Sequence, residues 1–197
     1  MRKLFFFAIF TASAFANVID LTPEEIERVK SGTDIVKSEE VNGAPFPRVR
    51  YYTFVKAPVD VIEQVFRDYE NSHKYVPSVV KATIVSQPHP DTYIVETISK
   101  LPITGESKST VKNVFRKKDV VVIVEWTLVE SDQAAESKGQ LCAAPTEGGC
   151  LMRYTNFVKP KITLGIIGLL KNAALKEVEK NVAALKGESE KRTKELR

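Results

Sequence analysis

The chain has 197 residues, with 29 Lys and Arg, 25 Asp and Glu, and a formal net charge of +4, a surplus too small to indicate nucleic-acid binding. Its 43% hydrophobic content excludes a disordered chain, and its 9 Gly and 10 Pro are too few for a fibrous protein. The 2 Cys and 2 His leave no spare ligand for a structural zinc site and exclude a cysteine-rich scaffold, so composition indicates one globular domain.

Residues 1–16 have the pattern of a secretory signal peptide. Arg2 and Lys3 form a basic start, and Leu4–Phe10 is an apolar run too short to span a bilayer as a helix. Small residues follow at Ala14 and Ala16, which places the expected cleavage after Ala16. We therefore expect an exported protein, periplasmic or secreted, whose single domain occupies residues 17–197.

A short helix and a β-hairpin open the domain. Thr22, Pro23 and Glu25 have the spacing of an N-cap, a first helical residue and a capping-box acid, and Gly32 ends the helix. Residues 34–41 and 48–56 alternate in polarity around an Asn-Gly turn, which predicts a hairpin.

A second helix is predicted to begin at Pro58. Its apolar residues recur on one face, which indicates packing against a core: Val59, Ile62, Val65, Phe66 and Tyr69. Residues 71–77 then break the pattern.

Residues 78–160 change to a period of two, which is typical of strands. Short turns separate the segments, so neighbouring strands are expected to pair antiparallel. The predicted strands are 79–86, 92–101, 106–116, 120–129, 139–143 and 151–158.

The chain ends in a long predicted helix with one continuous apolar stripe: Ile167, Leu170, Ala174, Val178, Val182 and Leu185. Gly187 weakens the helix, and the polar residues of the last ten positions are expected to fray. One helix must cover the apolar face of the whole sheet, so the sheet should curve around it and leave a cavity. The predicted fold class is α+β, a curved antiparallel sheet wrapped around a long C-terminal helix.

The sequence resembles the START-like helix-grip superfamily, which includes START lipid-transfer domains and polyketide cyclase/dehydrase-like proteins. The resemblance rests on the order of several short motifs. These are Val55–Tyr69 with its Ala-Pro and terminal Asp-Tyr, Tyr75–Ala82 with Pro77, the strand at Gly139, and Tyr154 before the long helix. It implies a ligand cavity between sheet and helix, and it carries over no catalytic residue.

Several residues are expected to line this cavity. Val124, Trp126 and Leu128 share one face of their strand, whereas Glu125 belongs to the opposite face. Glu96 stands among apolar residues, where a carboxylate could orient a polar headgroup. The remaining expected lining residues are Tyr154, Ile166, Ile167, Leu170 and Ala174.

The apolar segment 162–170 has a second interpretation as a lid or a membrane-touching edge. Its two glycines would let it move, and lysines bracket it. We expect a ligand to enter near residues 166–170, with the loop at 99–105 as the opposite rim.

Cys142 and Cys150 flank a predicted turn, and an oxidising compartment would let them form a disulfide that closes the hairpin. The alternative is a redox or metal pair, but no acidic or histidine cluster surrounds them. No metal site, cofactor or catalytic constellation is expected, because neither His73 nor His89 has a partner at triad or ligand spacing.

Together these features predict an exported binding protein for a lipid or another hydrophobic small molecule. We expect a monomer with transient membrane contact and no nucleic-acid partner. One alternative is a cyclase/dehydrase-like enzyme that uses a cavity carboxylate or tyrosine, with Glu96, Glu125, Tyr52 and Tyr154 as candidates. The other is a protein-interaction module of the cell envelope, which would have a solid core.

Overall fold

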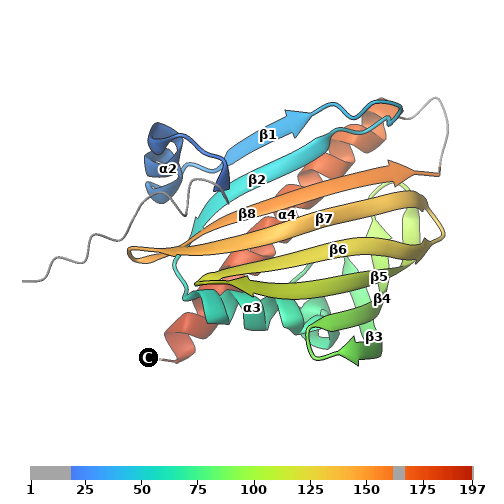
Figure 1. The fold of residues 1–197 in the computed structure, drawn as a ribbon. Coiled ribbons are helices and arrows are strands. Elements are labelled where there is room, and N and C mark those ends of the chain that lie inside the picture. Colours follow the sequence, from blue (N-terminus) through green and yellow to red (C-terminus); the bar gives the residue numbers. More distant parts are fainter. Residues whose placement is uncertain (1–18, 162–166, 197) are drawn as a thin grey trace, which may run out of the picture.

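The computed structural model of the chain describes residues 19–161 and 167–196. One eight-stranded antiparallel sheet has the strand order β1-β2-β8-β7-β6-β5-β4-β3. The long helix α4 runs diagonally across one face of this sheet, and α3 lies beside its C-terminal half (Figure 1). In chain order the elements are α2 (Pro23–Lys30), β1 (Ile35–Glu39), β2 (Arg48–Val55), α3 (Val59–Arg67), the 3-10 helix η1 (Tyr69–Lys74), β3 (Val79–His89), β4 (Thr92–Leu101), β5 (Gly105–Lys118), β6 (Val121–Ser131), β7 (Ala134–Thr146), β8 (Gly149–Pro160) and α4 (Ile167–Glu195).

The predicted α+β helix-grip architecture is therefore confirmed. Helix α2 begins with the predicted capping box, in which the Thr22 amide donates to Glu25 Oε2 at 2.9 Å. In return, the Glu25 amide donates to Thr22 Oγ1 at 3.2 Å. Strands β1 and β2 form the predicted hairpin, with Ile35 paired to Tyr52 and Glu39 to Arg48.

Alternation along each strand separates the sheet into an inner face toward α4 and an outer face. The inner core is filled by large side chains in the half of the sheet that α3 covers. These are Phe115, Val122, Val124, Trp126, Leu141 and Met152 from the strands, with Ile62 and Val65 from α3 and Val178, Val182 and Leu185 from α4.

A second, smaller core lies on the outer face. There Ile19, Leu21 and Val29 cover a patch of the sheet formed by Tyr52, Val121, Cys142, Ala144 and Leu151. The Tyr52 hydroxyl donates to Asp20 Oδ1 at 2.9 Å, and Arg153 also donates to this oxygen. The segment before α2 is thereby tied to β2 and β8.

The predicted disulfide between Cys142 and Cys150 is wrong: both cysteines are buried free thiols. The hairpin turn pairs Thr146 with Gly149, so Cys142 lies opposite Arg153 and Cys150 opposite Pro145. Because neighbouring residues of a strand point to opposite faces, this register places Cys150 in the inner core and Cys142 in the outer one. A bridge would have to pass through the sheet.

The expected fraying of the last ten residues is also wrong, because α4 continues to Glu195. Arg192 Nη2 donates to Asp68 Oδ2 at 2.7 Å, which joins the end of α4 to the end of α3. Glu190 Oε1 accepts from the Lys56 amide at 3.0 Å. Ser189 and Thr193 are buried, and their hydroxyls donate to carbonyls one turn earlier.

Among the described helices, none is both long enough and apolar enough to span a membrane.

Candidate functional site

A cavity of about 370 Å³ lies between α4 and the inner face of the sheet. It occupies the end of the sheet that α3 does not cover, since its lining includes no α3 residue. Residues of β4 to β8 form one wall and the first half of α4 forms the other.

The cavity exists because inward-facing positions become small at this end of the sheet. Strand β5 carries Phe115 in the core, but six and eight residues earlier it contributes Ser109 and Ser107 to the cavity lining. Helix α4 contributes the small residues Ala173 and Ala174 to the opposite wall. These small side chains cannot fill the space between helix and sheet, which a close-packed core would otherwise occupy.

Two aromatic side chains mark the boundary between the cavity and the core. The rings of Trp126 and Tyr154 lie 4.9 Å apart between centroids, and Trp126 also stacks on Phe66 at 5.9 Å. Both Trp126 and Tyr154 line the cavity, while Phe66 packs against the core. Burial raises the pKa of the Tyr154 hydroxyl, so this group is protonated across the physiological pH range.

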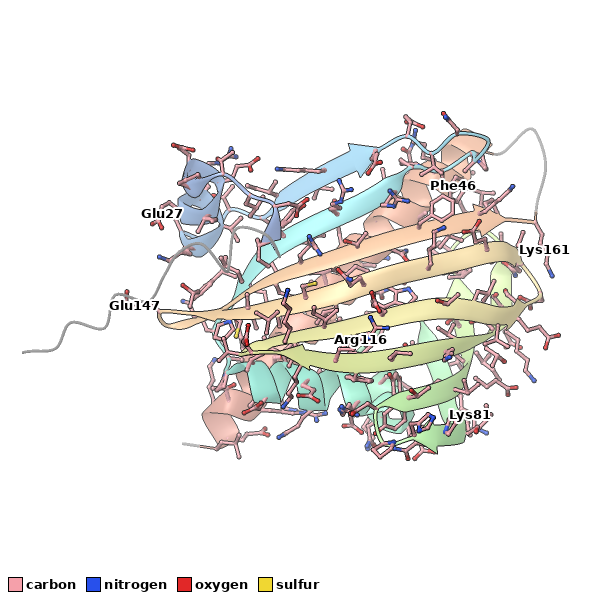
Figure 2. All side chains as sticks on the ribbon, viewed as in Figure 1. Glu27, Phe46, Lys81, Arg116, Glu147 and Lys161 are labelled. Carbon is pink, nitrogen blue, oxygen red and sulfur yellow. The ribbon has the colours of Figure 1, made fainter. Side chains whose placement is uncertain are left out.

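Apolar residues surround the outer part of the cavity. Pro102 and Ile103, in the turn between β4 and β5, line the cavity and are exposed to solvent. Leu170 of α4 and Phe46 also line it. Figure 2 shows Phe46 beside α4 just before β2, whereas Arg116 stands on the outer face of the sheet.

The structure brings together five of the predicted cavity residues: Trp126, Leu128, Tyr154, Leu170 and Ala174. Val124 shares the face of Trp126 but is fully buried in the core rather than in the cavity wall. Ile166 lies outside the described residues, and Ile167 is described only as the first residue of α4.

The prediction that Glu96 faces the cavity is wrong. Ser99 and Leu101 line the cavity from the inner face of β4. Because side chains alternate between the two faces of a strand, Val95 and Thr97 share this inner face and Glu96 points to the outer one. Glu96 Oε2 instead forms an ion pair with Lys108 Nζ at 2.9 Å on the outer face.

Two other candidate polar residues also lie away from the cavity. Glu125 forms an outer ion pair with Arg116 at 2.9 Å, as its strand alternation predicted. Tyr52 belongs to the outer core. Of the tyrosines and carboxylates weighed from sequence, only Tyr154 lines the cavity.

Sequence reasoning missed Glu177 and Asn181, which line the cavity from α4. They lie one turn apart, each directly before a residue of the apolar stripe, Val178 and Val182. A signal was present, because Glu177 follows Leu170 by seven residues and therefore lies close to the same face of the helix. The polar residues Ser99, Ser107 and Ser109 were missed because serines in strands are typical of exposed faces.

Within residues 19–161 and 167–196, no group of three or more His, Cys, Asp and Glu side chains could hold a metal ion.

Comparisons with known proteins agree with this architecture. The family model described as polyketide cyclase / dehydrase and lipid transport matches residues 47–190. No curated protein sequence matches the chain significantly.

Solved structures with this fold include lipid-transfer proteins and a cyclase. A STAR-related lipid transfer protein from Xanthomonas axonopodis is similar with a TM-score of 0.70 and 17% identity, over 78% of this chain and 92% of that one. Human StAR-related lipid transfer protein 5 gives a TM-score of 0.65 and 10% identity, over 91% of this chain and 97% of that one. An aromatase/cyclase from a Streptomyces species gives a TM-score of 0.64 and 15% identity, over 74% of this chain and 94% of that one.

Proposed function

The chain belongs to the polyketide cyclase / dehydrase and lipid transport family, and we propose that it binds a lipid or another hydrophobic small molecule. The observation that carries the proposal is the cavity of about 370 Å³ beneath α4. A solid core would have favoured the alternative of a protein-interaction module, and the cavity argues against it.

The size and lining of the cavity indicate what kind of molecule it would take. Its volume lies near the lower end of the roughly 300–1,000 Å³ range of small-molecule sites. Apolar surface buried there would contribute roughly 25 cal/mol per Å² before ordering costs. The cavity therefore suits one small apolar molecule or a single apolar chain.

We also propose that the protein loads its ligand at a membrane surface. Ile103 is 36% exposed at the cavity rim, and Leu169, which precedes the cavity residue Leu170, is 59% exposed. Such a pair of exposed apolar side chains could enter the interfacial region of a bilayer. The exposed Lys100 would then face anionic headgroups.

Export is the third part of the proposal and rests on residues 1–16, which lie outside the described residues. Their basic start, short apolar run and Ala14-Phe15-Ala16 support a signal peptide. The test is the mass of the protein purified from the cell envelope or medium: a chain that begins at Asn17 is expected. An intact Met1 in a cytosolic fraction would contradict export.

A second candidate function is catalysis of the cyclase kind, which Tyr154 and Glu177 favour because both line the cavity. A protonated phenol and a carboxylate next to a bound carbonyl compound could transfer protons. If Tyr154→Phe leaves ligand binding intact but abolishes conversion of an aromatic polyketide, the enzyme interpretation gains support.

The binding proposal is tested by extraction and by fluorescence. Protein purified from cells is extracted with organic solvent and the extract is analysed by mass spectrometry, with the expectation of a stoichiometric apolar compound. Trp126 is the only tryptophan of the chain and lines the cavity, so apolar ligands should change its emission. An empty extract together with unchanged Trp126 emission across a panel of apolar probes would contradict the proposal.

A further inference from the structure

The cavity wall contains polar oxygens that have no partner. Among the described residues, five buried side-chain polar atoms lack a hydrogen bond, and three of them belong to cavity-lining residues: Thr104 Oγ1, Glu177 Oε1 and Asn181 Oδ1. A buried polar atom without a partner costs free energy, so native proteins rarely leave one unsatisfied without a ligand or water.

Two of the three oxygens belong to residues on the same face of α4. Glu177 and Asn181 are separated by one turn of α4 and belong to the face of the helix that lines the cavity, together with Leu170, Ala173, Ala174 and Val178. A carboxylate oxygen and an amide oxygen are both hydrogen-bond acceptors. These two oxygens therefore need a hydrogen-bond donor, which a molecule bound in the cavity would supply.

The charge of the lining residues further restricts the class of ligand that the cavity can bind. Among the described lining residues, Glu177 is the only Asp, Glu, Lys, Arg or His. The nearby Lys171 pairs with Glu40 at 3.2 Å, and Lys161 donates to the Ser131 carbonyl. A carboxylate or phosphate placed in this cavity would lose its hydration beside a like charge, and none of the described lining residues would supply a counter-charge.

We propose that the cavity selects an uncharged amphiphile whose buried end carries a hydroxyl or amide N–H group, donated to Glu177 and Asn181. Ser99 and Ser109 on the opposite wall supply further hydroxyls that can hydrogen-bond the same polar end, whereas the Ser107 hydroxyl donates to Asp132 Oδ1 at 2.8 Å. This inference rests on the proposed binding function and specifies its ligand class.

The test compares three ligands that share one alkyl chain: decanol, decyl methyl ether and decanoate. Affinities are measured at pH 8 by calorimetry and by Trp126 emission. Decanol is expected to bind roughly tenfold more tightly than the ether, because only the alcohol donates to the unpaired oxygens. Decanoate should bind more weakly than either.

Two variants link this preference to the named residues. In Glu177→Gln, decanoate binding should improve roughly tenfold as the like charge disappears. In Asn181→Leu, the preference for decanol over the ether should shrink. The matched control is Glu179→Gln, which changes an exposed carboxylate on the same helix and should leave all three affinities unchanged.

Equal affinity for decanol and the ether in the wild type would overturn this inference while leaving the binding function intact. So would a preference that survives in the double variant Glu177→Gln, Asn181→Leu, because it would assign the selectivity to other groups. Failure of all three ligands to bind would overturn the inference, and an empty extract together with unchanged Trp126 emission across the panel of apolar probes would overturn the proposed function as well.

Discussion

The indole ring of Trp126 occupies the space that a side chain at Gly139 would need. The two residues are paired across β6 and β7, and a methyl group at position 139 would overlap the indole and the Thr155 carbonyl oxygen. The glycine therefore allows the tryptophan to lie flat against the sheet, where it separates the cavity from the core.

We expect Gly139→Ala to displace Trp126 and lower the free energy of unfolding by about 1–3 kcal/mol, since added atoms in a packed core force side chains off their preferred positions. Urea unfolding followed by circular dichroism measures the loss, and a shift of Trp126 emission reports the displaced ring. Because the same ring forms part of the cavity wall, affinity for apolar probes should also fall.

The matched control is Gly187→Ala in α4, where a methyl group would meet no atom within 4 Å. Since alanine favours a helix more than glycine does, this change should stabilise the protein by up to about 1 kcal/mol. A Gly139→Ala variant as stable as the wild type would show that the indole can move without cost.

Filling the cavity should abolish binding without harming the fold. Ala174→Phe places a large apolar side chain from α4 into the cavity, so affinity for apolar ligands should fall roughly tenfold or more. The melting temperature should stay the same or rise, because the new ring buries apolar surface in existing space. Ala183→Phe, at an exposed position of the same helix, is the control and should bind like the wild type. Unchanged affinity in Ala174→Phe would mean that ligands bind elsewhere.

Exposed apolar residues at the rim should affect transfer more than affinity. In the variant Leu169→Asp, ligand transfer from phosphatidylglycerol vesicles should slow several-fold, because a charged side chain does not enter the interfacial region. Affinity for the same ligand in solution should change little. Val120→Asp alters an equally exposed valine at the opposite end of β5 and β6 and serves as the control. Equal transfer rates in all three proteins would contradict membrane loading through the rim.

Both cysteines should be free and unreactive in the native protein. Burial raises the pKa of the Cys142 thiol and raises that of Cys150 to about 12. Alkylation without reductant should therefore add two groups in urea and almost none in native protein at pH 8. Because the pKa of Cys150 is higher in the folded than in the unfolded chain, its protonated thiol contributes to stability in full below the ordinary thiol pKa of about 8.5. This contribution is lost as the pH rises toward 12. Detection of an intramolecular disulfide by mass spectrometry would contradict the register of β7 and β8.

The contact between Asp68 and Arg192 should make the C-terminal half of α4 sensitive to acid. Burial alone would raise the pKa of Asp68, but hydrogen bonds from Asn71 and Arg192 outweigh it and hold this pKa below its usual value. Its stabilising contribution is therefore complete above pH about 4 and is lost as pH falls further. Asp68→Asn should lower the free energy of unfolding by about 1–2 kcal/mol at pH 7 and by much less at pH 3.

Urea unfolding at the two pH values measures this difference. Glu70→Gln removes an exposed carboxylate from the neighbouring helix η1 and should have little effect at either pH. An equal loss of stability in Asp68→Asn at pH 3 and pH 7 would show that the cost comes from packing rather than from the charge.

Local patterns in the sequence determined most of the fold. The alternation of Val122, Val124 and Trp126 identified the inner face of β6, and the apolar stripe from Leu170 to Leu185 identified the face of α4 that the sheet covers. Capping at Thr22 fixed the start of α2. Such signals depend only on neighbours along the chain, so they can be interpreted without knowing which segments meet.

Register and packing volume were decided only by the tertiary structure. From sequence alone, the turn before Gly149 could be placed in more than one way within residues 145–149. A shift of one residue in the strand register reverses the face of the sheet to which each side chain points. The sequence therefore did not reveal that Cys142 and Cys150 lie on opposite faces. Likewise, Glu177 and Asn181 resemble ordinary surface residues of a helix. They line a cavity because the side chains opposite them, Ser107 and Ser109 among them, are too small to fill the space between helix and sheet.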